Sequence, residues 1–183
     1  MKKLVFCLLF ILFHSCIPYK IAPKIDGELI VKAKKFKKNL PNFYGFIFKD
    51  TKNADEFYKF INTKYNLKNI NVDSNVPIKI NNKTYYLSFF ERERTTETIN
   101  LIPFVIDAHR SSKGNDPILE DLYSSRNGFW YIVLTVTDTE IQDCLNPNYP
   151  QHNEIISHLK NLKKEYFSTN NYMEAYLKMK LTP

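Results

Sequence analysis

A carboxylate and an imidazole lie two residues apart in the segment Asp107-Ala108-His109, and Asp116 and Glu120 follow shortly after. These are suitable metal ligands, and a carboxylate beside a histidine is also a common pair for proton transfer. Asp116 and Glu120 have a second explanation, because acidic residues stabilise the first turn of a helix. Asp107 and His109 are therefore the candidates for a hydrolase or a metal-assisted enzyme, with a structural role as the alternative.

Four alternating charges form a second cluster, Glu91-Arg92-Glu93-Arg94. In a strand, Glu91 and Glu93 project from one face, about 7 Å apart along the chain. Residues 96–107 are predicted to return as a second strand, which places Asp107 far from Glu91. A site built from both clusters is therefore disfavoured, and solvated charges that protect a strand end are the alternative for the glutamates.

Several common catalytic classes lack their motifs in this sequence. With four glycines in the whole chain there is no Gly-rich phosphate loop. The sequence contains no CxxC pair, no HExxH and no GxSxG, which excludes the usual zinc and serine-hydrolase signatures. No cofactor and no metal site are predicted.

Aromatic residues make up 15% of the chain and are dense in two stretches. Such side chains line grooves for a sugar, a peptide or a lipid, although filling the core is their more frequent role. The residues in question are Tyr85, Tyr86, Phe89, Phe90, Phe129, Trp130 and Tyr131.

The amino terminus has the layout of a secretory signal. Lys2 and Lys3 precede an unbroken apolar run over residues 4–13, and His14-Ser15-Cys16 closes it. The run is too short to span a bilayer, which takes roughly 20 residues.

The segment Leu12-Phe13-His14-Ser15-Cys16 resembles the lipobox of bacterial lipoproteins. The resemblance implies removal of residues 1–15, a diacylglycerol thioether on Cys16 and acylation of the new amino terminus, which together anchor a protein stably. The residues after Cys16 lack the Asp that marks inner-membrane retention in some lipoproteins, which points to the periplasmic face of the outer membrane. A plain signal peptide followed by an ordinary Cys16 is the alternative.

The composition of the remaining 168 residues fits one domain with a packed core, since 44% of the chain is apolar. Once Cys7 is removed and Cys16 is acylated, Cys144 has no intrachain partner for a disulfide. It is predicted to be a small buried hydrophobic residue.

The net charge of +7 is local. Residues 20–38 hold seven lysines against two acidic residues, whereas basic and acidic residues balance from residue 39 onward. Lys20 and Lys24 lie nearest to Cys16 and are predicted to contact anionic head groups of the bilayer. Nucleic-acid binding is disfavoured because the chain is predicted to be exported and the rest of it is neutral.

The order of the predicted elements indicates an α+β fold in a single domain over residues 27–183, preceded by a lipidated tether over residues 16–26. Strands that are grouped rather than alternating with helices favour a mostly antiparallel sheet, here of about six strands with about four helices. Strands are predicted at 29–36, 44–48, 78–80, 84–94, 96–107 and 129–137, and helices at 54–65, 117–127, 152–167 and from 171. Asn81-Asn82-Lys83 is predicted to be a hairpin turn between two of the strands, and Gly128 to lie just beyond the end of the second helix.

Two of the predicted helices have an apolar stripe that should face the core. Asn53 and Glu56 are predicted to form a capping box at the start of the first helix. The inward residues are predicted to be Ala54, Phe57, Tyr58, Ile61 and Tyr65 in the first helix, and Ile155, Ile156, Leu159, Leu162 and Tyr166 in the helix at 152–167.

The sequence therefore predicts a membrane-anchored lipoprotein that is a non-enzymatic binding or envelope-associated module. A hydrolase or metal-assisted enzyme that uses Asp107 and His109 is the alternative. An enzyme should place these two side chains together in a cleft, whereas a binding module should have an apolar or aromatic groove.

Overall fold

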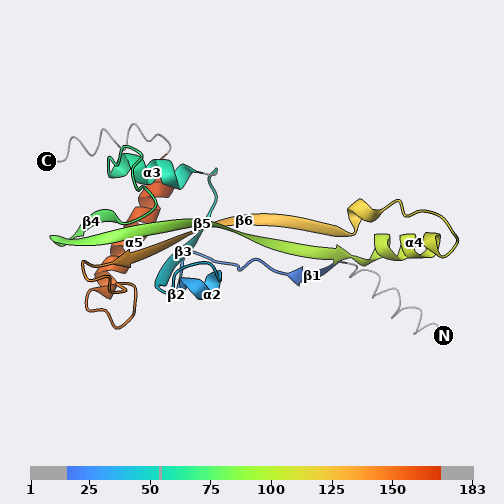
Figure 1. Cartoon of the computed structure of the whole chain (residues 1–183), viewed down its shortest axis with the longest axis horizontal. Coiled ribbons are helices and arrows are strands. Elements are labelled where there is room, and N and C mark those ends of the chain that lie inside the picture. The colour runs from blue at the N-terminus through green and yellow to red at the C-terminus, as the bar shows by residue number, and fades with distance from the viewer. Residues whose placement is uncertain (1–15, 54, 170–183) are drawn as a thin grey trace. The chain divides into compact units, whose positions relative to one another are not determined.

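The computed structural model describes residues 16–53 and 55–169, so the signal peptide and the predicted helix from residue 171 lie outside the described residues. The fold is α+β as predicted, and the described part contains a six-stranded antiparallel sheet and four α-helices (Figure 1). The elements are β1 (Cys16–Lys20), β2 (Leu29–Lys32), α2 (Ala33–Phe36), β3 (Tyr44–Asp50), α3 (Glu56–Lys64), β4 (Val76–Ile80), β5 (Lys83–Asn100), α4 (Leu101–Ser111), a 3-10 turn η1 (Glu120–Leu122), β6 (Ser124–Thr137) and α5 (His152–Ser168).

The described chain divides into two compact units. Unit 1 comprises residues 16–24 and 93–129, and unit 2 comprises residues 25–92 and 130–169. The strands β5 and β6 contribute residues to both units. Unit 1 therefore contains β1, α4, η1 and one part each of β5 and β6. Unit 2 contains the other part of these two strands together with the remaining helices and strands.

In unit 2, β5 pairs with β4, and β3 lies between β6 and β2. The β4–β5 hairpin was predicted, and its turn consists of Asn81 and Asn82, with φ angles of 48° and 65°. A two-residue turn in which both φ angles are positive matches the twist of the flanking strands, and asparagine tolerates that conformation. Pro77 is compatible with β4 because it is exposed and the strand is at an edge of the sheet.

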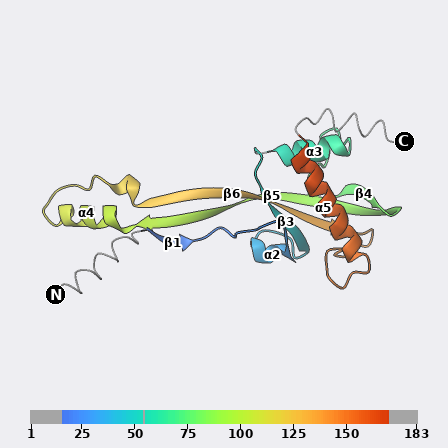
Figure 2. The same ribbon diagram turned by 180° about the vertical axis from the view of Figure 1, so that it is seen from behind.

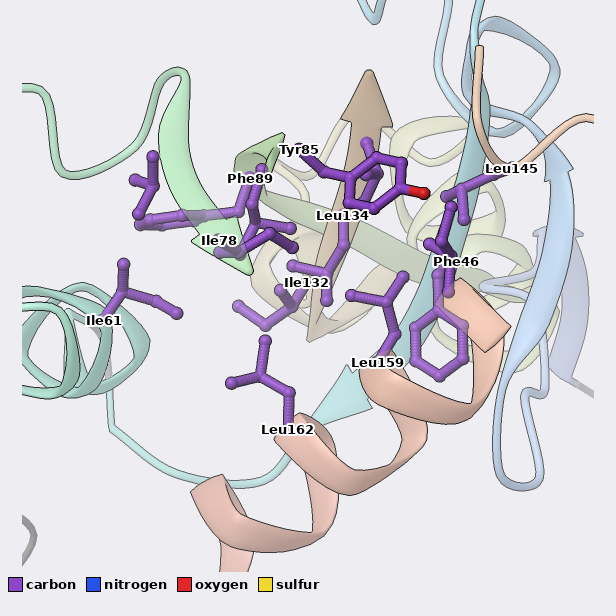
Figure 3. Close-up of a cluster of buried hydrophobic side chains, with 14 of the residues drawn as sticks. Phe46, Ile61, Ile78, Tyr85, Phe89, Ile132, Leu134, Leu145, Leu159 and Leu162 are labelled. Carbon is purple, nitrogen blue, oxygen red and sulfur yellow. The ribbon is translucent and has the colours of Figure 1, made fainter. Parts of the chain in front are cut away.

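The helix α5 crosses the strands of unit 2 and covers one face of the sheet (Figures 1 and 2). Its inward stripe has the predicted helical spacing, and all five predicted residues are buried. Figure 3 shows Leu159 and Leu162 directed toward Ile132 and Leu134 of β6. The five residues are Ile155, Ile156, Leu159, Leu162 and Tyr166.

The opposite face of the unit 2 sheet has its own small apolar cluster beneath α2. The ring of Phe36 packs edge-on against Tyr131, with 5.3 Å between ring centroids. Gly45 leaves room for Val133 and for Ala33 of α2, since a Cβ there would lie 2.9 Å from Cγ1 of Val133 and 3.3 Å from Cβ of Ala33. The predicted strand over residues 29–36 is wrong in its second half, because Ala33 and Phe36 bury one face of a helical turn instead.

The helix α3 was predicted, but its predicted capping box is not formed. The helix begins at Glu56, and its N-cap residue, Asp55, is in the left-handed region with φ 65° and makes no side-chain cap bond. Phe57 and Ile61 are buried as predicted, and Phe60 joins them in the core.

The predicted return strand over residues 96–107 is wrong. Instead of turning, β5 continues to Asn100, and the chain then forms α4. Thr95 is β-branched and buried, so it favours the extended strand over a turn. Pro103 fits because it lies in the first turn of α4, where a helix needs no backbone donor.

The predicted helix over residues 117–127 is also wrong. That region contains only the short turn η1, and β6 begins at Ser124, so Gly128 is a strand residue rather than a helix terminator. A Cβ at residue 128 would meet the carboxylate of Glu93, which would have to move aside.

Candidate functional site

Asp107 is almost fully buried in unit 1, with 1% exposure, although it lies on a helix whose other residues are largely exposed. Its carboxylate accepts hydrogen bonds from the backbone N–H groups of Ile118 and Leu119, the shortest at 2.7 Å, and from the hydroxyl of Tyr123 at 2.8 Å. Burial acts to raise the pKa of Asp107, but these donors outweigh it and hold the pKa below its usual value. Asp107 therefore fastens the segment after α4 to that helix.

The structure does not bring Asp107 and His109 together. Two residues apart on an α-helix, their side chains are separated by about 200° around the axis. Accordingly, Asp107 is buried and His109 is exposed.

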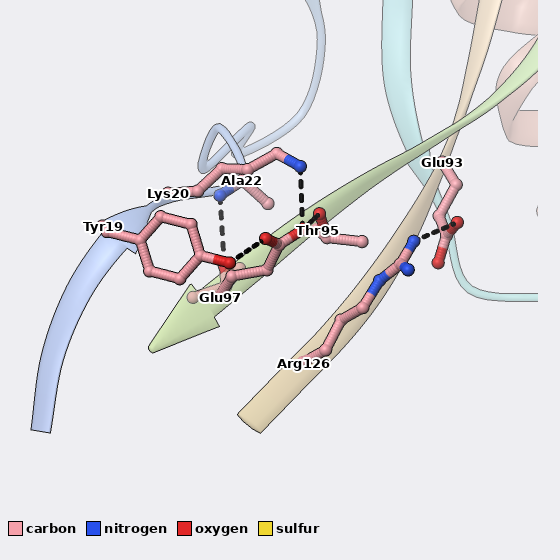
Figure 4. A network of polar contacts seen from close by, with 8 residues as sticks. Tyr19, Lys20, Ala22, Glu93, Thr95, Glu97 and Arg126 are labelled. Carbon is pink, nitrogen blue, oxygen red and sulfur yellow. Dashed lines mark hydrogen bonds and ion pairs between the residues drawn. The ribbon is translucent and has the colours of Figure 1, made fainter. Parts of the chain in front are cut away.

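The two glutamates of the second cluster belong to different units. Glu93 lies in unit 1 and pairs with Arg126 of β6, with 3.4 Å between Oε2 and the guanidinium (Figure 4). Glu91 lies in unit 2, where burial raises the pKa of its carboxyl. Both side chains are half-buried rather than fully solvated.

Unit 1 has an unusual distribution of apolar side chains. Its buried residues, within 16–24 and 93–129, are Ala22, Thr95 and Asp107. Apart from three residues of unit 2, every exposed large hydrophobic side chain in the described chain lies in unit 1. These residues are Ile17, Tyr19, Ile21, Ile99, Leu101, Ile102, Phe104, Val105, Ile106, Ile118 and Leu122.

The strand β1 is held against β5 by a polar network centred on Glu97 (Figure 4). Its carboxylate accepts hydrogen bonds from the hydroxyl of Tyr19, from Nζ of Lys20 at 2.8 Å and from the hydroxyl of Thr95 at 2.7 Å. These hydrogen bonds lower the pKa of Glu97 to about 2. In this arrangement the charge of Lys20 is paired within the protein.

The register of β1 places Cys16 opposite Asn100, the last residue of β5. Because α4 begins at the next residue, Leu101, the predicted site of lipidation lies beside the start of the exposed helix. This juxtaposition could not be read from the sequence, since residues 16 and 100 are far apart along the chain.

Unit 2 contains a pocket of about 530 Å³ on the face of the sheet opposite α5. Alternate residues of β5 form one wall, with Tyr86, Ser88 and Phe90 on this face and Tyr85, Leu87 and Phe89 buried in the core on the other. The volume lies within the range of small-molecule sites. The other lining residues are Pro41, Phe43, Asn75, Thr135, Thr137, Asp138, Thr139 and Ile141.

The polar groups of this pocket are mostly hydroxyls. Its one carboxylate among the lining residues, Asp138, is engaged by its own turn: Oδ1 accepts from the N–H groups of Glu140 and Gln142, both at 2.9 Å. The other oxygen, Oδ2, accepts from the hydroxyl of Tyr149 at 3.1 Å. The pocket therefore combines aromatic rings, neutral hydrogen-bonding groups and one carboxylate whose two oxygens already accept hydrogen bonds.

The turn that Asp138 holds contains a strained residue at the edge of the pocket. Ile141 has a φ of 62°, a region that β-branched residues rarely occupy, and its side chain is 71% exposed. Such strain persists where surrounding contacts fix it, and it concentrates at ligand sites.

A second hollow, of about 380 Å³, shares Asp138 and Thr139 with the first. Tyr85 and Tyr149 contribute their hydroxyl-bearing rings to it, and Lys83 contributes a positive charge. Thr84 and Gln151 complete the lining. The two hollows share this turn, but Tyr85 lies on the core side of β5, so they flank the strand on different sides.

Of the aromatic residues predicted for a groove, Tyr86 and Phe90 line the larger pocket and Tyr85 lines the smaller one. Phe89 and Tyr131 are buried in the interior. Sequence reasoning missed the threonines of β6 and the 138–141 turn, because their proximity to β5 depends on strand pairing.

Within residues 16–53 and 55–169, no three side chains of the His, Cys, Asp and Glu types gather in a way that would hold a metal ion. No helix in that part of the chain is long and apolar enough to cross a membrane. Comparison with known proteins gave no matching family, no similar curated protein and no similar solved structure.

Proposed function

We propose that the chain is a lipid-anchored cell-envelope protein that binds a neutral ligand, most simply a carbohydrate, in the larger pocket of unit 2. The lipobox resemblance of residues 12–16 supports the anchor. The observation that carries the binding role is the lining of the pocket, in which the rings of Phe43, Tyr86 and Phe90 share one cavity with threonine and serine hydroxyls.

A carbohydrate fits this lining for two reasons. The C–H faces of a sugar ring are apolar and cover aromatic rings, and sugar hydroxyls exchange hydrogen bonds with side-chain hydroxyls and amides. The lining of the larger pocket contains no lysine or arginine, which argues against an anionic ligand. A few polar groups within a mainly apolar cavity is the usual composition of a small-molecule site.

The alternative function, a hydrolase that uses Asp107 and His109, receives no support from the geometry. All the hydrogen bonds of the Asp107 carboxylate serve to hold its own unit together. A general base must also reach the group from which it takes a proton, and the imidazole of His109 lies on the other side of the helix.

The test is a calorimetric titration of the purified protein with a panel of soluble neutral oligosaccharides. For the sugar that binds, Phe90→Ala should weaken binding at least tenfold, because stacking on its ring is lost. Thr137→Val, which keeps the shape and removes a hydroxyl, should weaken it severalfold.

The matched control is Trp130→Phe, which changes an exposed aromatic residue of unit 2 that does not line the pocket. It should bind like the wild type. Binding that survives Phe90→Ala and Thr137→Val, or the absence of binding across the panel, would contradict the carbohydrate proposal.

The residues after Cys16, which lack the Asp of inner-membrane retention, support a location on the periplasmic face of the outer membrane. Protease added to intact cells should then leave the protein uncut, and the same protease should digest it after the outer membrane is permeabilised. Rapid digestion on intact cells would show that the protein faces the outside.

A further inference from the structure

We infer that the exposed apolar face of α4 is a second membrane contact, which lies in the head-group region of the bilayer that holds the acylated Cys16. This inference rests on the proposed lipid anchor and extends it from a tether to a docked orientation of unit 1.

The helix α4 is inverted relative to an ordinary surface helix, which buries its apolar stripe and exposes its polar one. Its buried side chain is the carboxylate of Asp107, whereas Val105, on the opposite side of the helix, is 62% exposed. Ile102, three residues before Val105 on the same face, is 45% exposed. The polar bonds of Asp107 thus hold the helix with its apolar face toward the outside.

The apolar face lies beside the predicted lipid attachment. In antiparallel strands, paired Cα atoms are about 5 Å apart, so the pairing of Cys16 with Asn100 places residue 16 next to the first turn of α4. Acyl chains attached at Cys16 would hold the bilayer surface against this edge of unit 1. The continuity of the anchor with the helix is what selects a bilayer as the occupant.

The dimensions and charge of unit 1 indicate how it would meet the bilayer. The 11 residues of α4 are too few to span the hydrocarbon core, so the helix would lie in the interface plane. Residues 16–24 and 93–129 contain six basic and six acidic residues. With no net charge, the contact depends on apolar burial, and neutral lipids suffice.

A second copy of the chain or a protein partner would also cover an apolar face. Binding either of them would cost translational freedom. The proposed anchor already holds the bilayer surface beside α4, so contact with the bilayer does not have this cost. The bilayer is therefore the favoured occupant, and the others become distinguishable outcomes of the test.

The experiment uses the mature, acylated protein carrying Val105→Cys, reconstituted in phosphatidylcholine vesicles. An environment-sensitive fluorophore is attached to the new cysteine. Acylation blocks Cys16, and Cys144 is buried, so the label attaches to the new thiol. The matched control is Ile70→Cys, which has a similar exposure of 66% but belongs to unit 2.

On reconstitution, the emission of the Val105 probe should shift to the blue and be quenched by nitroxide lipids. The rate constant for its quenching by aqueous iodide should fall at least threefold. The Ile70 probe should show none of these changes. Equal iodide quenching of both probes in vesicle-bound, acylated protein would overturn this inference alone.

The Val105 probe could instead become shielded from iodide in detergent without vesicles, to an extent that rises with protein concentration. That result would assign the face to a second copy of the chain and overturn the membrane contact. Protein that carries no acyl group and does not remain with vesicles would overturn the proposed anchor and this inference with it. The acyl state, measured by mass spectrometry on the same sample, separates the two failures.

Discussion

Removing the apolar character of α4 should weaken membrane binding by a predictable amount. The perturbation is Ile102→Ser with Val105→Ser in the mature chain beginning at Ile17, which lacks the acyl anchor. Fully burying such a side chain stabilises by about 1.5–3 kcal/mol, and these two are 45% and 62% exposed. Each would therefore gain about 1 kcal/mol on entering the interface, which gives about 2 kcal/mol for the pair.

A loss of about 2 kcal/mol lowers the partition coefficient about thirtyfold, since about 1.4 kcal/mol corresponds to a factor of ten. The assay is sedimentation with phosphatidylcholine vesicles over a range of lipid concentrations. The control pair, Ile70→Ser with Ile141→Ser, removes side chains that are 66% and 71% exposed in unit 2 and should leave partitioning unchanged.

The α4 variant should melt like the wild type, because the altered side chains are already exposed. A partition coefficient of the α4 variant within threefold of the wild-type value would refute the reasoning. An equal decrease in the partition coefficient of the control pair would also refute it.

Two further predictions concern titrating groups. The folded pKa of Glu97, about 2, lies below its ordinary value of 4.5, so its contribution to the attachment of β1 is complete above pH 4.5 and is lost as the pH falls toward 2. Hydrogen exchange of the β1 amides should accelerate over that interval, and Glu97→Gln should abolish this dependence. Burial raises the pKa of Cys144 from 9.0 to about 12, so its thiol should react about a thousandfold more slowly in the native protein than after unfolding at pH 8. Comparable rates with a thiol reagent in the two states would show that Cys144 is accessible.

Elements whose signals are local could be predicted from the sequence. The apolar period of α5 and the two asparagines between β4 and β5 each determine their structure within a few residues, and both were predicted correctly. Cys144 was also predicted to be buried, and it is. These cases need no knowledge of distant residues.

The helix α4 could not be predicted for a physical reason. The run from Leu101 to Ile106 is continuously apolar, so no period separates a helix from a strand. The outcome depends on the bonds between Asp107 and the backbone of Ile118 and Leu119, which only the folded chain reveals. The same applies to the pocket, because the sequence shows the aromatic residues of β5 but not the threonines that β6 places beside them.

The prediction for Lys20 and Lys24 is refined by the structure but stays a prediction. Lys20 is paired with Glu97, and the remaining lysines of residues 20–38 after Lys24 belong to unit 2. Because unit 1 carries no net charge, we expect the proposed membrane contact to depend weakly on salt.

The most direct test of the account is mass spectrometry of the amino-terminal peptide from protein purified out of the membrane fraction. We expect the chain to begin at Cys16, with a diacylglycerol thioether on its sulfur and an acyl group on its amino nitrogen, and we expect Cys16→Ser to remove this modification and release the protein from membranes. A mature chain that begins elsewhere, or an unmodified Cys16 in protein that still sediments with membranes, would contradict the central claim.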